Sequence, residues 1–338
     1  MADRATLVLA GGKASRFQMK NTSWKDKALA EIDGKPLLLH VIENLKNKVG
    51  KIALCVNNEQ RIDQYKKRLD KDTLDNIEFV VDQECGLVKG PLLAITSGLQ
   101  AVEAKYFFVV PTDMPFIQPE VANYLIDVCD GYEVTVPMWP DGTLETLLMA
   151  LERESCIETT KTLCSLGKSS ADAIFRATAK LHLVSPIKKI SKIDPELRSF
   201  ININSQDDLA RPKTRSIEGV VKQDICFDRG KLPFEQLQWL RAGQEMLCEG
   251  KLLDALTIFA DCASRFEASN FFFWAAVSRE KLGETQLRLS KKTIAKQTCA
   301  KAAENYRKEA EAYSEKGCRL LAERALADKK FCEEKSPI

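Results

Sequence analysis

The chain has 338 residues, 45% of them hydrophobic, and its 50 basic and 48 acidic side chains leave a formal net charge of +2. This length predicts two domains, and charges so nearly balanced imply no general affinity for nucleic acids or membrane surfaces. No apolar stretch is long enough to span a bilayer and the first residues do not resemble a signal peptide, so we expect a cytoplasmic protein.

Metal centres built from cysteine and histidine are not expected. The eleven cysteines form no Cys-x-x-Cys pair, and the two histidines, His40 and His182, lie far apart.

Short apolar runs alternate with amphipathic segments through residues 1–209. The runs that predict strands are 7–10, 52–56, 77–81 and 106–110, and the segments that predict helices are 36–46, 60–69 and 91–102. Apolar runs that do not alternate with polar residues are typical of strands covered on both faces. The pattern predicts an α/β domain with a Rossmann-like, doubly wound and mainly parallel sheet.

The first predicted strand ends in a glycine turn with many positive charges after it. Ala10, Gly11 and Gly12 close the strand, and the following loop carries Lys13, Arg16, Lys20, Lys25 and Lys27. Adjacent glycines let backbone N–H groups approach a ligand closely, and charged donors strengthen hydrogen bonds to phosphate. The turn therefore predicts a polyphosphate site, although a solvated basic loop explains this stretch alone equally well.

Polar residues also follow the other predicted strands. Asn57, Asp82 and Asp113 stand at the ends of the second, third and fourth strands, where doubly wound sheets bind ligands. Asp113 lies between Pro111 and Pro115, on a stiff backbone beside the phosphate loop. A single carboxylate facing a triphosphate is sufficient to hold Mg²⁺, so Asp113 is the predicted metal ligand.

Several segments, in this order, resemble nucleotidyltransferases of the molybdenum cofactor guanylyltransferase type. The similar segments are 9–16, 26–29, 34–37, 90–92, 112–117 and 200–204. The resemblance covers roughly residues 5–209 and implies the fold of nucleotide-diphospho-sugar transferases.

The resemblance also implies roles for individual residues. The implied GTP-binding residues, of which the first three present backbone groups to guanine, are Leu9, Ala10, Gly11, Gly12, Lys13, Lys27, Asn57, Asp82 and Asp113. Lys27, Arg16 and Asp113 are the implied catalytic residues, with Mg²⁺ on Asp113. The implied acceptor side contains Asn202 and Asn204, which are expected to lie at the end of a strand. Glu145, Asp141 and Gly142 are implied to lie on the same side.

The implied reaction moves GMP from GTP onto a phosphorylated acceptor, most favourably a molybdopterin-type cofactor, and releases pyrophosphate. The chain departs from the family pattern by an insert, Phe17 to Lys25, which leaves base and acceptor open. Adenosylcobinamide phosphate or a sugar 1-phosphate are alternative acceptors. An alternative of another class is a nucleotide-binding scaffold whose helices bind a protein partner, although the retention of Lys13, Arg16, Lys27 and Asp113 together favours catalysis.

The α/β pattern stops near Leu209. Residues 210–231 are expected to form a linker, and 232–338 a helical domain with breaks at Gly250, Gly283 and Gly317. The spacing of small and aromatic residues resembles that of a tetratricopeptide repeat, and an ordinary helical hairpin is the alternative. The residues that carry the resemblance are Trp239, Ala242, Gly243, Met246, Ala255 and Phe259.

Fewer than three repeats cannot bury a continuous core, so the helices are expected to pack on the catalytic domain, a partner protein or a second copy. The apolar run 271–274 is predicted to lie in that core or interface, and 291–330 to form a long helical pair.

Overall fold

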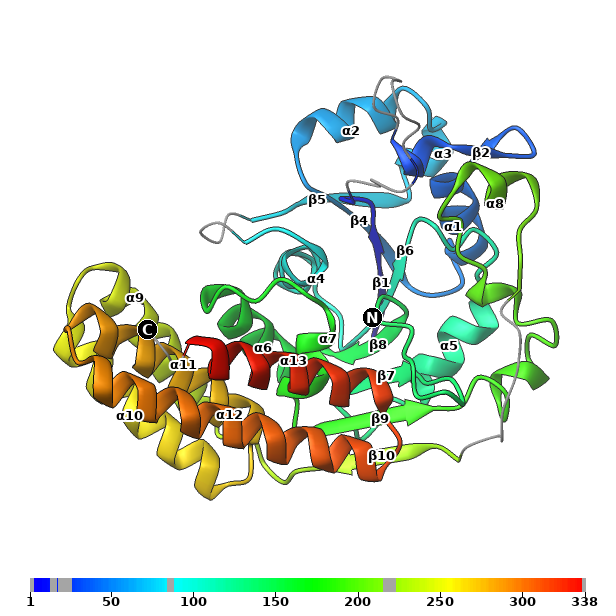
Figure 1. The fold of residues 1–338 in the computed structure, drawn as a ribbon. Coiled ribbons are helices and arrows are strands. Elements are labelled where there is room, and N and C mark those ends of the chain that lie inside the picture. Colours follow the sequence, from blue (N-terminus) through cyan, green and yellow to red (C-terminus); the bar gives the residue numbers. More distant parts are fainter. Residues whose placement is uncertain (1–2, 13–16, 18–25, 84–87, 215–222, 336–338) are drawn as a thin grey trace.

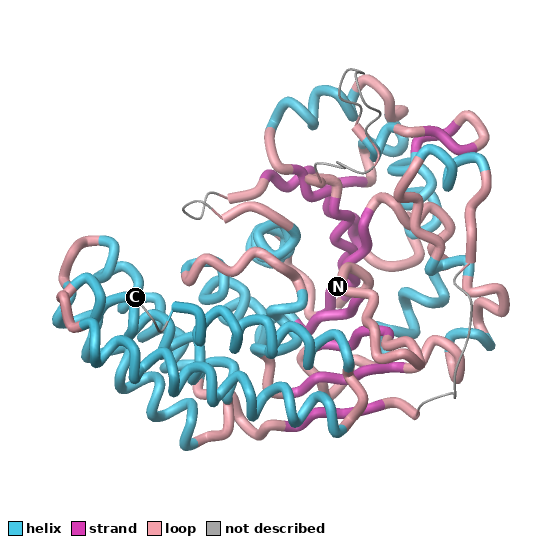
Figure 2. Tube along the Cα trace, in the orientation of Figure 1, coloured by secondary structure: helices cyan, strands magenta, loops and turns pink. Residues whose placement is uncertain are grey.

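The computed structural model describes residues 3–12, 17, 26–83, 88–214 and 223–335. An eight-stranded sheet with the order β10-β9-β7-β8-β6-β1-β4-β5 runs through its centre (Figures 1 and 2). The strands are β1 (Arg4–Leu9), β4 (Lys51–Val56), β5 (Ile77–Val81), β6 (Tyr106–Pro111), β7 (Val134–Pro137), β8 (Met149–Glu152), β9 (Lys180–Val184) and β10 (Ile225–Asp228). A small ribbon pairs β2 (Glu31–Ile32) with β3 (Lys35–Pro36).

The expected mainly parallel sheet is confirmed, and its four predicted strands are β1, β4, β5 and β6. These four are mutually parallel, and β7 is parallel to β9. Strand β8 runs antiparallel to both β6 and β7, and β10 runs antiparallel to β9. The carboxyl ends of β5, β4, β1 and β6 therefore meet at one edge of the sheet.

Helices cover both faces of the sheet, which explains the continuous apolar strands. Leu7 and Phe107 pack against α4 on one face, and Val8 and Phe108 pack against α1 and α5 on the other. The helices of this part are α1 (Leu37–Leu45), α2 (Glu59–Lys66), α3 (Lys71–Leu74), α4 (Pro91–Ala101), α5 (Pro119–Asp127), α6 (Arg153–Ser165), α7 (Asp172–Ala177) and α8 (Gln206–Ala210), with 3-10 turns η1 (Lys27–Leu29), η2 (Ile190–Lys192) and η3 (Arg198–Phe200).

The C-terminal part is a stack of helices in which each packs on the next. They are α9 (Phe234–Cys248), α10 (Leu252–Ala268), α11 (Phe272–Arg288), α12 (Lys292–Glu315) and α13 (Arg319–Lys335). Gly250 and Gly317 end helices at positive φ, as predicted. The predicted break at Gly283 is wrong, because α11 continues through it. A Cβ there would lie 3.1 Å from Cys299 Sγ, so this glycine allows α11 and α12 to approach.

The expected linker 210–231 contains a strand, because β10 pairs with β9 and extends the sheet before the helices begin. The helices then pack on the α/β part of the same chain. This is one of the three arrangements expected from the sequence, the others being packing on a partner protein or on a second copy. Trp274, in the apolar run 271–274, is fully buried and donates its indole N–H to the Ala177 carbonyl over 2.8 Å.

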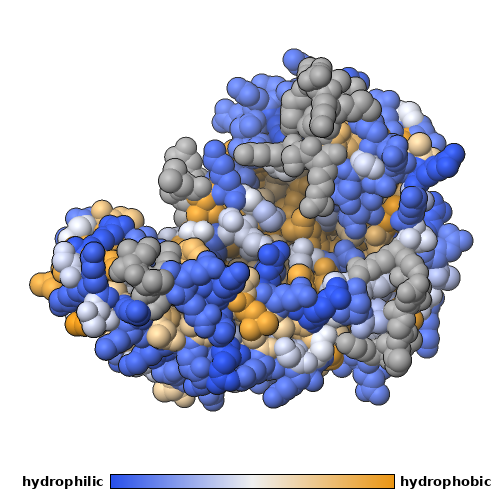
Figure 3. Space-filling model, in the orientation of Figure 1, coloured by the Kyte–Doolittle hydropathy of each residue, from blue (hydrophilic) through white to orange (hydrophobic). Residues whose placement is uncertain are grey.

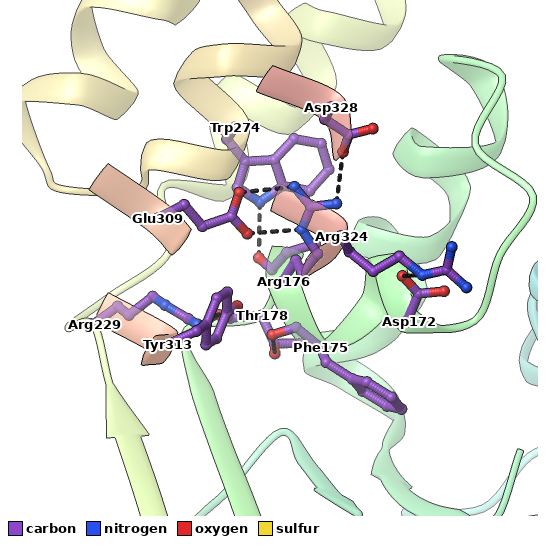
Figure 4. A network of polar contacts seen from close by, with 11 residues as sticks. Asp172, Phe175, Arg176, Thr178, Arg229, Trp274, Glu309, Tyr313, Arg324 and Asp328 are labelled. Atoms are coloured by element: carbon purple, nitrogen blue, oxygen red, sulfur yellow. Dashed lines mark hydrogen bonds and ion pairs between the residues drawn. The ribbon is translucent and has the colours of Figure 1, made fainter. Parts of the chain in front are cut away.

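A buried ion-pair network joins the two parts (Figure 4). The Arg176 guanidinium on α7 donates to both carboxylate oxygens of Glu309 on α12, over 2.7 and 2.8 Å, and to Asp328 on α13 over 2.7 Å. The same guanidinium lies against the rings of Phe273 and Tyr306. The helices are thus part of the core that supports the sheet.

The face in Figure 3 is mostly hydrophilic, with apolar patches that include the outer end of the helical stack. Among the described residues, no helix combines the length and the hydropathy that crossing a membrane requires.

Candidate active site

Three polar side chains from distant parts of the chain meet near the carboxyl end of β6. The Lys27 ammonium donates to Asp113 Oδ2 over 2.7 Å and to Asn204 Oδ1 over 3.1 Å. Asp113 follows β6 by two residues, and its carbonyl accepts a hydrogen bond of 2.9 Å from the N–H of Ile203. Two of the predicted catalytic residues and one predicted acceptor-side residue therefore share one cluster.

Asp26 sets the start of the turn that carries Lys27. Its Oδ1 accepts a hydrogen bond from the N–H of Ala28 over 3.0 Å and caps η1. Its Oδ2 accepts from the Tyr65 hydroxyl over 2.9 Å and lies 3.6 Å from Arg61 Nε. Helix α2 thereby holds the residue next to Lys27.

The same helix holds the glycine turn at the end of β1. Arg61 donates to the Ala10 carbonyl and, over 2.9 Å, to the Gly12 carbonyl. The Ala10 N–H donates to the Cys55 carbonyl over 2.8 Å, so the protein engages both backbone groups of Ala10, which had been expected to face the base. Sequence reasoning missed Arg61 and Tyr65; their i, i+4 spacing on a helix after Asn57 was the available signal.

The predicted nucleoside residues lie beyond the neighbouring strands. Asn57 follows β4, and a Cβ on Gly11 would lie 3.4 Å from Asn57 Cβ, so the glycine lets the turn lie against it. Asp82 follows β5, three strand positions from β6, which places it roughly 14 Å from Asp113 at the usual strand spacing. Burial raises the pKa of Asp82 to about 6, opposed by the charge of Arg61.

Asp113 has the chemistry of a divalent-cation ligand. Its Oδ1 is buried and has no hydrogen-bond partner among the described residues, whereas Oδ2 receives Lys27. The described part of the chain contains no group of three or more His, Cys, Asp and Glu side chains arranged to hold a metal. A cation on Asp113 would therefore need oxygens from a phosphorylated ligand, which is how Mg²⁺ is usually bound.

The predicted acceptor side is only partly assembled around the cluster. Asn202 and Asn204 follow η3 in an irregular segment, so the expected strand end is wrong: the Ile203 N–H bonds to the Asp113 carbonyl instead of to a neighbouring strand. Glu145 accepts a hydrogen bond from Trp139 Nε1 over 2.6 Å, and the Trp139 ring packs edge-on against Phe200. Glu145 is thus connected to the segment that carries the two asparagines.

Asp141 and Gly142 instead contact the helical part. Asp141 pairs with Arg319 at 3.4 Å, and the Gly142 carbonyl accepts from the N–H of Leu320 over 3.1 Å. Both contacts join the loop between β7 and β8, which was expected to form the acceptor side, to the start of α13.

Other predicted residues fall outside the described residues. These are Lys13, Arg16 and residues 18–25 of the expected insert. Phe17, the first residue of that insert, is described, and its side chain is buried.

A cavity of about 610 Å³ lies at the opposite edge of the sheet. Tyr106 and Lys180, which begin β6 and β9, line it together with Glu133. Burial raises the pKa of Glu133 to about 7. Since Asp113 follows the other end of β6, this cavity is separate from the Lys27 cluster.

Comparisons with known proteins identify a family for this chain. Residues 6–182 match the family model of the MobA-like NTP transferase domain. A probable molybdenum cofactor guanylyltransferase of Methanosarcina acetivorans is 31% identical over 207 residues, covering 61% of this chain and 88% of that protein. A protein of the same name from Methanosarcina mazei is 32% identical over 206 residues, with the same coverage.

A solved structure is similar in fold. The crystal structure of molybdopterin-guanine dinucleotide biosynthesis protein A from Archaeoglobus fulgidus aligns with a TM-score of 0.50 and 24% identity, covering 61% of this chain and 95% of that one.

Proposed function

The chain belongs to the MobA-like NTP transferase family, and from this membership we propose that it transfers GMP from GTP to a molybdopterin-type cofactor and releases pyrophosphate. The observation that carries the proposal is the Lys27, Asp113 and Asn204 cluster at the end of β6. It combines a cation for phosphate with a carboxylate oxygen left open for a divalent ion.

In the proposed reaction an acceptor phosphate oxygen attacks the α-phosphorus of GTP. A new P–O bond forms there, the bond to the β-phosphate oxygen breaks, and pyrophosphate leaves with the electron pair. An ionised acceptor phosphate is already a nucleophile at neutral pH, so the protein need not supply one. Catalysis then consists of alignment and charge stabilisation.

The residues of this chain have distinct proposed tasks. Lys27 binds the phosphates and stabilises the charge that develops on the transferred group, with Arg16 and Lys13 as further cations. Asn204 orients the Lys27 ammonium, since its side-chain oxygen accepts from it at 3.1 Å. Asn57 and Asp82 hold the nucleoside beyond β4 and β5, while Asn202 and Glu145 lie toward the acceptor.

Asp113 is the proposed Mg²⁺ ligand, because its buried Oδ1 has no partner among the described side chains. When bound, the ion would neutralise negative charge on the reacting phosphates. The enzyme is therefore proposed to be Mg²⁺-dependent.

The names of the relatives from two Methanosarcina species favour molybdopterin as acceptor. The experiment that tests this is pyrophosphate release with each nucleoside triphosphate and Mg²⁺ against three acceptors: molybdopterin, adenosylcobinamide phosphate and a sugar 1-phosphate. Turnover with GTP and molybdopterin alone is expected. Turnover only with another acceptor would show that the proposed acceptor, molybdopterin, is wrong. Tight GTP binding without any turnover would favour a nucleotide-binding scaffold.

A further inference from the structure

One helix of the α/β part contacts both ends of the segment that joins β1 to η1. On α2, Arg61 donates to the carbonyls of Ala10 and Gly12 at the start of that segment. One helical turn later, the Tyr65 hydroxyl donates its single proton to Asp26 Oδ2 at the end of the segment. We refer to Arg61 and Tyr65 as the α2 pair. Both side chains reach both ends, since the Tyr65 hydroxyl lies 3.2 Å from the Ala10 carbonyl and 2.9 Å from Asp26, and Arg61 Nε lies 3.6 Å from Asp26 Oδ2.

These contacts are shielded from water. Arg61 is 5% exposed and Tyr65 is fully buried. Burial raises the pKa of Tyr65 far above its ordinary value, with the charge of Asp26 as the second cause, so the hydroxyl keeps its proton. Hydrogen bonds that water cannot replace hold their partners in fixed positions.

The contact with the Ala10 carbonyl also orients the glycine turn. The described residues contain no cis peptide, so the Ala10 carbonyl and the Gly11 N–H point in opposite directions. With the carbonyl held against α2, the Gly11 N–H faces away from α2. The Gly11 N–H is therefore not turned toward the α2 pair.

On the other side the α2 pair acts through Asp26. Asp26 caps η1, and Lys27, the first residue of η1, reaches Asp113. We propose that Arg61 and Tyr65 are positioning residues for nucleotidyl transfer, which fix the glycine turn and Lys27 relative to each other and to Asp113. This inference rests on the function proposed above.

A double-mutant cycle between Tyr65→Phe and Lys27→Ala tests the proposal. Tyr65→Phe keeps the buried ring and removes only the hydroxyl, so we expect kcat for pyrophosphate release to fall about tenfold. The unfolding temperature should fall by a few degrees, because the buried Asp26 carboxylate loses a donor but keeps Arg61 beside it. In the Lys27→Ala background the same change should alter kcat less than about twofold, because its effect is transmitted through Lys27. Equal fold-changes in both backgrounds would overturn the proposal.

Two further variants separate positioning from general stability. Tyr106→Phe is the matched control, since it removes a hydroxyl that donates to Asp130 over 2.7 Å at the opposite sheet edge, and it should leave kcat unchanged. Arg61→Lys keeps the charge but loses the paired contacts with two carbonyls, so we expect GTP to bind about tenfold more weakly. Unchanged GTP binding by Arg61→Lys would contradict the role given to Arg61.

Calorimetric titration of GTP with the same four proteins of the cycle distinguishes failure of this inference from failure of the proposed function. If the wild type binds GTP without turnover, the double-mutant cycle is evaluated with the dissociation constants for GTP in place of kcat. Equal fold-changes in both backgrounds would again overturn the proposal. If the wild type does not bind GTP, the proposed function is wrong and this inference is overturned with it.

Discussion

Lys27 and Asp113 form an ion pair of 2.7 Å in which one carboxylate oxygen is neutralised and the other is buried without a partner among the described residues. Removing charge from water is costly unless partners compensate for it. The half-satisfied carboxylate is therefore kept at a cost to stability, which is typical of a residue retained for ligand binding.

Asp113→Ala is expected to abolish transfer, because it removes the proposed Mg²⁺ ligand and the partner of Lys27. Pyrophosphate release measured across a Mg²⁺ series provides the test. Asp127→Asn is the control, since Asp127 is an exposed carboxylate paired with Arg4. Retention of most activity by Asp113→Ala in the presence of Mg²⁺ would refute the metal assignment.

Asp82 predicts a pH dependence of stability. Burial raises its pKa to about 6 in the folded protein, so the folded state binds the proton more tightly than the unfolded chain does. The contribution of Asp82 to the free energy of unfolding should thus fall as pH rises from about 4 to 6 and stay constant above. Asp82→Asn should lack this fall, so the unfolding temperature of the variant should rise relative to the wild type over that window. If the unfolding temperatures of the wild type and the variant change in parallel from pH 4 to 8, the raised pKa of Asp82 is excluded.

Gly142 and Gly167 form a matched pair for testing the contact between the acceptor-side loop and α13. Both have positive φ, but a Cβ on Gly142 would lie 2.4 Å from the Gly317 carbonyl oxygen, whereas one on Gly167 meets nothing within 4 Å. Gly167→Ala should cost about 1 kcal/mol of backbone strain, and Gly142→Ala about 1–3 kcal/mol more from the overlap. Urea unfolding measures the free energy of unfolding of both variants. Equal decreases would show that the backbone at the start of α13 moves to make room for the added methyl group.

Arg176 is expected to dominate the interface between the two parts. Arg176→Met leaves the buried Glu309 unpaired and should lower the free energy of unfolding by about 3–5 kcal/mol. Replacing Glu309 by Met as well should restore part of the loss. Arg307→Met, which breaks only exposed pairs on α12, serves as control and should change little. A double variant less stable than Arg176→Met would contradict this account.

The α/β fold was predictable because its strands are buried on both faces and therefore leave uninterrupted apolar runs. Strand β10 was not, because only one of its four residues, Phe227, is buried and it follows a segment with little periodicity. Gly283 was misread because a glycine that allows close helix packing looks, in one sequence, like a glycine that ends a helix.

The polar residues of the cluster could be named from the sequence, whereas the residues that hold them in place could not. The resemblance gave Lys27, Asp113 and Asn204 separate roles, and the structure brings the three side chains into one cluster. Arg61 and Tyr65 contact backbone carbonyls and the capping residue Asp26, and their i, i+4 spacing on one helix does not show which groups they contact. Asp141 was expected at the acceptor side, but its partner Arg319 lies 178 residues later, beyond what local patterns can indicate.

The buried Arg176 network joins residues that are made at different times during synthesis. Its acceptors, Glu309 and Asp328, follow it by 133 and 152 residues. A ribosome therefore releases the whole sheet before these carboxylates exist, and a nascent chain folded to that point holds an uncompensated guanidinium on α7. Helices α12 and α13 must therefore be made before the Arg176 guanidinium can gain its carboxylate partners.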